Sequence, residues 1–273
     1  MKKITIIISC LFMLLLSGCN TVKKDETVLT EEKPVVLYIV RHGKTYFNTV
    51  NLVQGWCDSL LTDVGQEQAD ALGVGLSDIE FVSAFASDLG RQRETAQRIL
   101  FQNKSASVPE LSTDIGLREA NFGKFEGQNS LVSFDEVLEH IGMQPGDYAT
   151  LMSTYTTAEI TDMIAECDET GECETVQQVQ ERVRAAIERI VADTREKGGG
   201  NVLIVSSGTA IADVLAVLNP AFDVLGSIDN CAVTILEVNG DSYDLITRND
   251  LSFLETGSKE MESGEYPEFA YAY

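Results

Sequence analysis

The sequence predicts an α/β fold: a three-layer sandwich with a mostly parallel, doubly wound sheet, helices on both faces and a small inserted helical cap. Three observations support this. Short apolar runs alternate with longer segments of helical periodicity. The first and third runs end abruptly in polar residues, which is typical of buried parallel strands that deliver side chains to the carboxyl edge of a sheet. Two alternating runs flank Asn239-Gly240-Asp241, which predicts a hairpin near the end of the chain.

The first strand and helix are predicted within residues 35–76. Residues 35–40, VVLYIV, form a continuous β-branched run, so they predict a buried strand that ends at Arg41-His42-Gly43. Residues 61–76 have helical spacing, with Thr62 as the expected N-cap.

The second strand is predicted at residues 81–87, followed by a helix at residues 90–100. The first turn of this helix carries Arg91 and Arg93. Because the helix dipole favours acidic side chains at this end, cations placed here indicate an anion to be bound. Arg93 is interpreted as a solvated helix charge.

The second half contains the longest predicted helix. Residues 176–192 repeat apolar side chains at helical spacing, and Thr175 with Gln178 forms a capping box at the start. The third strand, residues 202–205, ends at Ser206-Ser207-Gly208, and another helix follows. The hairpin spans residues 232–249.

The remaining segments complete the expected domain organisation. Residues 128–173 show poor periodicity and no strand pattern, so they are interpreted as the inserted cap over the sheet edge. His140, in this segment, is expected to be an exposed helix residue. The domain is expected to span residues 35–255, with a polar C-terminal tail at residues 256–273.

The N-terminus predicts export and a lipid anchor. Lys2 and Lys3 precede an apolar stretch at residues 4–16 that suits a signal peptide and is short for a membrane span. Leu16-Ser17-Gly18-Cys19 resembles a bacterial lipobox, so residues 1–18 are predicted to be cleaved and Cys19 to be acylated. Residues 19–34 are expected to form a flexible tether. The expected location is the extracytoplasmic face of the cell membrane; an ordinary secretory signal or N-terminal anchor is the alternative.

The charge and the cysteines limit the possible partners. The formal net charge is −23, which disfavours nucleic acid and electrostatic docking on anionic lipid. Cys57 and Cys231 are interpreted as small hydrophobic residues. Cys167 and Cys173 bracket a short polar turn, so a disulfide between them is plausible in an exported protein. With two histidines in the chain and no CxxC spacing, no metal site is expected.

A group of polar residues is expected at the carboxyl edge of the sheet. It includes Arg41, His42, Arg91, Glu119 and Ser207. Arginines bind phosphate oxygens in a fork, a neutral histidine is a nucleophile towards phosphorus, and a carboxylic acid can protonate a leaving alkoxide. Residue types alone make this a candidate phosphate site.

Five ordered stretches resemble the histidine phosphatase superfamily, the phosphoglycerate mutase-like proteins. They are LYIVRHGKTYFN, QGWCDSLLTDVGQEQADALG, FASDLGRQRETAQRI, LREANFGKFEGQ and IDNCAVTILE. The cap, the tether and the tail lie outside the resemblance.

The resemblance implies a role for each matched residue. His42 would take the phosphoryl group as phosphohistidine, and Glu119 would donate a proton to the leaving group and then activate water. Arg41 and Arg91 would clamp the phosphoryl oxygens. The phosphate loop would be lined by Gly43, Lys44, Thr45 and Asn48. No metal or organic cofactor would be needed, and the partner would be a small phosphorylated substrate.

One position departs from the family pattern. The third strand of the family ends Ser-His-Gly, and its histidine is a charged donor to the phosphoryl oxygens; here Ser207 takes that place. The expected function is phosphomonoester hydrolysis with reduced or specialised activity. The alternatives are a non-catalytic phosphate-ligand-binding surface lipoprotein, a purely structural surface lipoprotein, and, with less support from the cap, a phosphoglycerate mutase-type isomerase.

Overall fold

A six-stranded mixed sheet forms the centre of the domain. The computed structural model describes residues 33–222, 226–264 and 266–269. The strand order is β3-β2-β4-β1-β5-β6, with parallel pairing from β3 through β1 and antiparallel pairing from β1 through β6. The strands are β1 (Val35–Arg41), β2 (Phe81–Ala86), β3 (Leu111–Thr113), β4 (Gly200–Ser206), β5 (Val233–Asn239) and β6 (Ser242–Asp250). This confirms the mostly parallel sheet and the closing hairpin.

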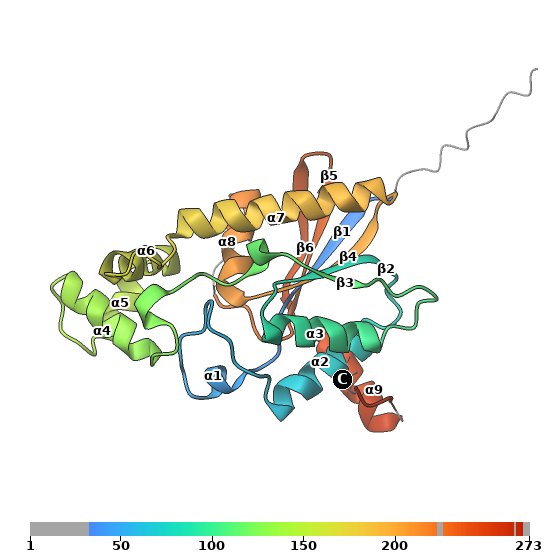
Figure 1. Ribbon diagram of the computed structural model, residues 1–273, viewed down its shortest axis with the longest axis horizontal. Helices are drawn as coiled ribbons and strands as arrows, with labels where there is room; N and C mark the ends of the chain where they lie inside the picture. The colour runs from blue at the N-terminus through green and yellow to red at the C-terminus, as the bar shows by residue number, and fades with distance from the viewer. Residues whose placement is uncertain (1–32, 223–225, 265, 270–273) are drawn as a thin grey trace, which may run out of the picture. The chain divides into compact units, whose positions relative to one another are not determined.

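Helices cover both faces of this sheet, as Figure 1 shows. One face packs against α7 (Val176–Glu196) and α8 (Gly208–Leu218), and the other against α2 (Asp63–Gly75), α3 (Gly90–Phe101) and α9 (Ser252–Ser263). Short elements connect them: α1 (Tyr46–Thr49), η1 (Ile115–Leu117) and η2 (Gly123–Phe125). The three layers agree with the predicted sandwich.

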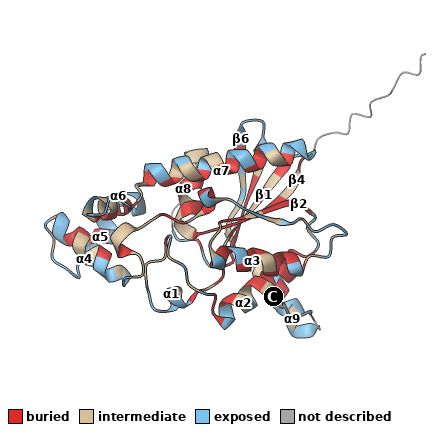
Figure 2. Cartoon of the chain, in the orientation of Figure 1, coloured by how far each residue is buried: buried red, intermediate tan, exposed pale blue. Residues whose placement is uncertain are grey.

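The strand sequences explain why the sheet is covered on both sides. Leu37 and Ile39 of β1 enter the core under α7, whereas Val40 enters the core under α2 and α3. Alternate side chains of a strand point to opposite faces, so a strand buried on both faces is a continuous apolar run. Figure 2 shows the complementary pattern in the helices, where buried and exposed residues alternate along α7.

Two predicted helix starts are present. Thr175 accepts a hydrogen bond from Gln178 N, and Gln178 Oε1 accepts one from Thr175 N, which completes the capping box. Thr62 accepts a hydrogen bond from Gly65 N at the start of α2. Each N-cap residue satisfies backbone donors that the helix itself cannot pair.

The cap consists of three short helices with a core of their own. They are α4 (Ser130–His140), α5 (Tyr148–Thr154) and α6 (Thr157–Cys167). Val137, Leu138, Leu151, Ile160 and Ile164 bury their side chains together with Phe125 of η2. His140 is exposed, as expected, and lies 3.1 Å from a carboxylate oxygen of Glu166.

The chain beyond residue 255 differs from the prediction of a polar tail. The predicted boundary falls inside α9, which packs closely on α2. A Cβ atom on Gly257 would lie 1.8 Å from Ala71 O, so only glycine permits this approach. Farther along, Phe269 stacks edge-to-face on Phe101. The apolar side of α9 was missed because Gly and Ser interrupt its periodicity.

The structure also differs at two other points. β3 was not predicted, because three residues with one apolar side chain give no strand pattern. Cys167 and Cys173 are free, so the predicted disulfide is not present; Cys173 is buried in the cap core beside Asp168, which accepts its backbone N–H.

The predicted signal peptide, Cys19 and nearly all of the tether lie outside the described residues. Within the described ranges, no helix combines the length and apolar character that a membrane crossing requires.

Candidate active site

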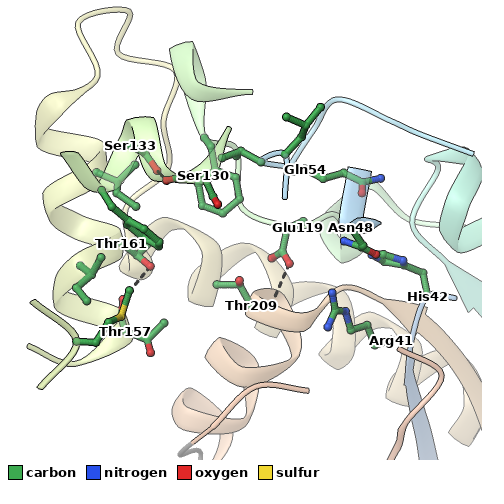
Figure 3. Close-up of a pocket in the computed structure, with 17 residues that line it drawn as sticks. Arg41, His42, Asn48, Gln54, Glu119, Ser130, Ser133, Thr157, Thr161 and Thr209 are labelled. Carbon is green, nitrogen blue, oxygen red and sulfur yellow. Dashed lines mark hydrogen bonds between the residues drawn. The ribbon is translucent and has the colours of Figure 1, made fainter. Parts of the chain in front are cut away.

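A cavity of about 290 Å³ lies between the carboxyl edge of the sheet and the cap. One end is lined by polar side chains from the sheet edge and its loops, and the other by α4, α5 and α6. Four of the predicted residues line it: Arg41, His42, Asn48 and Glu119. Figure 3 shows these four around the same end of the cavity.

His42 is positioned by the strand ends. Its backbone N–H donates to Ser206 O at 3.1 Å, which continues the β1–β4 pairing, and Asn230 Nδ2 donates to its carbonyl oxygen at 2.8 Å. Its Nδ1 lies 2.8 Å from Gly43 O. Since a carbonyl oxygen only accepts, Nδ1 carries the proton and Nε2 of the neutral ring keeps its lone pair.

Burial holds the His42 ring neutral. The side chain is 3% exposed, and burial, together with the positive charges of Arg91 and Arg41, lowers its pKa well below the ordinary value. A neutral imidazole with one free nitrogen is the form that can act as a nucleophile.

Arg41 is the last residue of β1. Its Nη1 donates to Ile228 O at 2.5 Å, which anchors one end of the guanidinium. Its Nε is buried without a hydrogen-bond partner. Burial lowers the pKa of Arg41, and the carboxylates of Glu119 and Asp229 oppose this shift. A buried guanidinium with an unpaired N–H next to a cavity has a donor available for an anion.

Glu119 is held at the start of α8. Its carboxylate accepts hydrogen bonds from Ala210 N at 2.8 Å, Thr209 N at 3.0 Å and Ala120 N at 3.0 Å. The first N–H groups of a helix have no partner within the helix, so a carboxylate placed there is bound and oriented. Among the described residues that line the cavity, Glu119 is the only acidic one.

Arg91 lies deeper than predicted. It is 1% exposed and does not line the cavity. Its terminal nitrogens donate to Cys57 O at 2.9 Å and Gly55 O at 2.7 Å, and Nη1 lies 3.1 Å from an oxygen of Asp58. Arg91 therefore fixes the loop of residues 54–58 and acts on His42 through its charge, while its Nε remains unpartnered. Arg93 is exposed, in agreement with its interpretation as a solvated charge.

Three predicted phosphate-loop residues also do not line the cavity. Gly43 N donates to Thr95 Oγ1, Lys44 N donates to Gln68 Oε1, and Thr45 caps α1 and donates to Gln54 Oε1 at 2.6 Å. A Cβ on Gly43 would lie 2.5 Å from Gly65 O, so this position needs glycine. These residues shape the loop, and Asn48 is the one of the four that lines the cavity.

Ser207 is buried and does not line the cavity. Its Oγ accepts a hydrogen bond of 2.6 Å from Gln92 Nε2 of α3. The hydroxyl is therefore engaged with a neighbouring side chain behind the site.

Two polar lining residues outside the cap were not predicted. Gln54 comes from the loop that Arg91 fixes, and Thr209 from the first turn of α8. A polar residue directly after a strand-ending Ser-Ser-Gly could have identified Thr209, because the carboxyl edge continues into that turn. Nothing local indicates Gln54. The described residues contain no cluster of three potential metal ligands.

A family model matches most of the chain. The model of the histidine phosphatase superfamily (branch 1) matches residues 37–251. The match covers most of β1, the other five strands and the cap, and it ends before α9.

One solved structure and two curated proteins illustrate what this chain is similar to. The crystal structure of a phosphoglycerate mutase from Bacillus anthracis str. Sterne superimposes with a TM-score of 0.77 at 34% identity, over 84% of this chain and 98% of the other. A broad-specificity phosphatase of Saccharomyces cerevisiae is 29% identical over 78% of this chain and 83% of its own length. The probable fructose-2,6-bisphosphatase TIGAR A of Danio rerio is 41% identical over 92 residues, which is 33% of this chain and 36% of that protein.

Proposed function

Because the chain belongs to the histidine phosphatase superfamily, we propose that it hydrolyses a phosphomonoester through a phosphohistidine on His42. The observation that carries this proposal is the state of His42: the ring is neutral, Nδ1 is committed to Gly43 O, and Nε2 is left free at the cavity. The names of similar proteins, which include a broad-specificity phosphatase, support it.

The reaction has two steps. His42 Nε2 forms a bond to phosphorus as the bond between phosphorus and the ester oxygen breaks, and Glu119 supplies a proton to the leaving alkoxide. A water molecule then gives up a proton to Glu119 and attacks phosphorus, which releases phosphate and restores the free ring. Arg41 stabilises the charge of the phosphoryl oxygens through the Nε–H group that the fold leaves unpaired.

Reduced activity is part of the proposal. The family resemblance implies a charged imidazole at position 207, and Ser207 offers a neutral hydroxyl that is already bonded to Gln92. Loss of one preorganised donor to a transition state costs about 2.7–4 kcal/mol, which corresponds to roughly 10²–10³ in rate.

The same observation favours a second candidate function. A chain that keeps the phosphate-binding groups and lacks one transition-state donor can bind a phosphorylated ligand without turning it over.

We further propose that the chain is lipid-anchored through Cys19 on the extracytoplasmic face; the sequence around Cys19 supports this location.

Hydrolysis of a panel of phosphomonoesters by the purified full chain and by its His42→Ala variant tests the proposal. Phosphate release that disappears in the variant is expected, because the variant lacks the nucleophile. Vanadate binding without phosphate release from any ester would instead identify a binding protein, and the absence of both would exclude a phosphate site.

A further inference from the structure

The cap end of the cavity is chemically unlike the catalytic end. Four lining residues of the cap are apolar: Phe134, Met152, Ile160 and Ile164. Four others carry hydroxyl groups: Ser130, Ser133, Thr157 and Thr161. Leu52, Val53 and Phe122 add apolar surface between the two ends. The part of a substrate that extends from the phosphoryl group into the cap therefore meets apolar and neutral polar groups.

Positive charge is confined to the catalytic end. Arg41 is the only Lys or Arg among the described residues that line the cavity. Residues 128–173 contain ten Asp and Glu and no Lys or Arg. A second phosphate or a carboxylate on the substrate would enter a region of negative potential without a cation to pair with.

Three basic side chains of segments that neighbour the cap and the site are already paired. Lys124 lies 2.7 Å from Glu136 of α4, and Arg182 Nη2 lies 2.6 Å from Glu174. Arg118 is paired with Asp88 and lies over the ring of Trp56. To recruit one of these cations, a ligand would have to break an existing ion pair, which leaves a carboxylate uncompensated.

From these contacts we infer that the substrate is a small monophosphate ester of an uncharged, partly apolar alcohol, with the phosphoryl group as its only anionic group. This inference rests on the proposed function, because it extends the same cavity from the reacting group to the leaving group. A cavity of about 290 Å³ holds a small ligand. The absence of a second cation among the described residues that line the cavity disfavours phosphoglycerates and sugar bisphosphates as substrates, since each carries a second anionic group.

The first test compares three esters on the full chain, purified in detergent. 1-Naphthyl phosphate has a neutral apolar alcohol, 3-phosphoglycerate adds a carboxylate, and fructose 2,6-bisphosphate adds a second phosphate. We expect kcat/KM for 1-naphthyl phosphate to exceed the other two by roughly tenfold or more. Equal or higher kcat/KM for either doubly anionic ester overturns the inference.

The second test adds a cation to the cap end. Met152 lines the cavity and is 50% exposed, so Met152→Lys can be accommodated at the mouth. We expect this variant to raise the ratio of kcat/KM for 3-phosphoglycerate to kcat/KM for 1-naphthyl phosphate by roughly five- to tenfold. Met152→Gln controls for the loss of the thioether. Leu131→Lys places the same charge on an exposed part of α4 outside the cavity.

The outcome separates the inference from the proposed function. An equal rise in the kcat/KM ratio of 3-phosphoglycerate to 1-naphthyl phosphate in Met152→Lys and Leu131→Lys would show a general effect of charge and would overturn the inference. Calorimetric Kd values of the three esters are measured on the same protein, so the ranking is obtained even without turnover. Absence of hydrolysis counts against the proposed function, whereas tighter binding of a doubly anionic ester counts against the substrate class.

Discussion

Gln92 Nε2 donates a hydrogen bond of 2.6 Å to Ser207 Oγ, and both side chains are buried. The pair joins α3 to the end of β4, and Gln92 Oε1 has no hydrogen-bond partner. Gln92 thus lies where a larger side chain at position 207 would have to extend. Because packed interiors do not absorb a ring without displacing a neighbour, an imidazole at position 207 needs a smaller residue at position 92.

The first prediction concerns this pair. Ser207→His alone should give little gain in turnover, because the ring collides with Gln92. Ser207→His combined with Gln92→Ala should raise kcat/KM on an aryl phosphate by up to about 10²–10³, since it restores a charged donor near the phosphoryl group.

Gln92→Ala alone is the control and should not raise turnover. Addition of His42→Ala to the double variant should remove all activity, because the nucleophile is lost. If the double variant is folded and no faster than the wild type, the serine does not limit the reaction.

The second prediction concerns Glu119. Glu119→Gln should lower kcat by about 10²–10⁴ on an alkyl phosphate, because the amide cannot donate the proton of a carboxylic acid. The loss should be much smaller on 4-nitrophenyl phosphate, whose leaving group needs no proton. Steady-state kinetics on both esters measure this difference; an equal loss on both would assign Glu119 to positioning instead.

The third prediction concerns the charge of His42. Burial and the neighbouring arginines lower its pKa well below the ordinary value of 6.5, so the ring should stay neutral as the pH falls from 8 through 6.5. The ring C2 proton should therefore keep one chemical shift across this range in an NMR titration. The chain has two histidines, and a His140→Gln variant assigns the signal. A midpoint near pH 6.5 for the His42 signal would contradict the prediction.

The fourth prediction concerns Asp213 of α8, which the proposed mechanism does not use. Burial, followed by the negative charges of Glu119 and Asp162, raises the pKa of Asp213 to about 7. The unfolded chain has a value of about 3.9, so the folded state binds more protons between these two values. The free energy of unfolding contributed by this group is therefore largest at low pH and is lost as the pH rises towards 7.

Asp213→Asn removes this dependence. Relative to the wild type, the variant should gain roughly 2–3 kcal/mol in the free energy of unfolding between pH 5 and pH 8, measured by reversible denaturation. Asp78→Asn is the control, because the Asp78 side chain is 88% exposed. Parallel pH profiles for Asp213→Asn and the wild type would show that the carboxyl is already ionised at pH 5.

The fifth prediction concerns the N-terminus. If the lipobox functions, Cys19→Ala should leave an unprocessed precursor or release the chain from the membrane fraction. Mass spectrometry of the wild-type N-terminus should find a lipid on Cys19. Normal cleavage and unchanged membrane retention in the variant would rule out this anchor.

The sheet and the catalytic strand end were predictable because their signals are local. A buried parallel strand needs a continuous apolar run, and VVLYIV ending at Arg41-His42 has that pattern within eight residues. The capping box of Thr175 and Gln178 is equally local. The extent of α9 was not predictable, because its packing depends on Gly75 and Gly257 meeting backbone atoms of a distant helix.

The sequence by itself determined most of the strands and helices and the presence of Arg41 and His42 at a strand end, because periodicity and end residues are encoded over a few positions. Only the tertiary structure decided that carbonyls of residues 54–58 engage Arg91, that Gln92 meets Ser207, and which side chains of the cap line the cavity. These relationships join segments 34 to 115 residues apart. Their distances follow from how whole elements pack, and no local pattern encodes them.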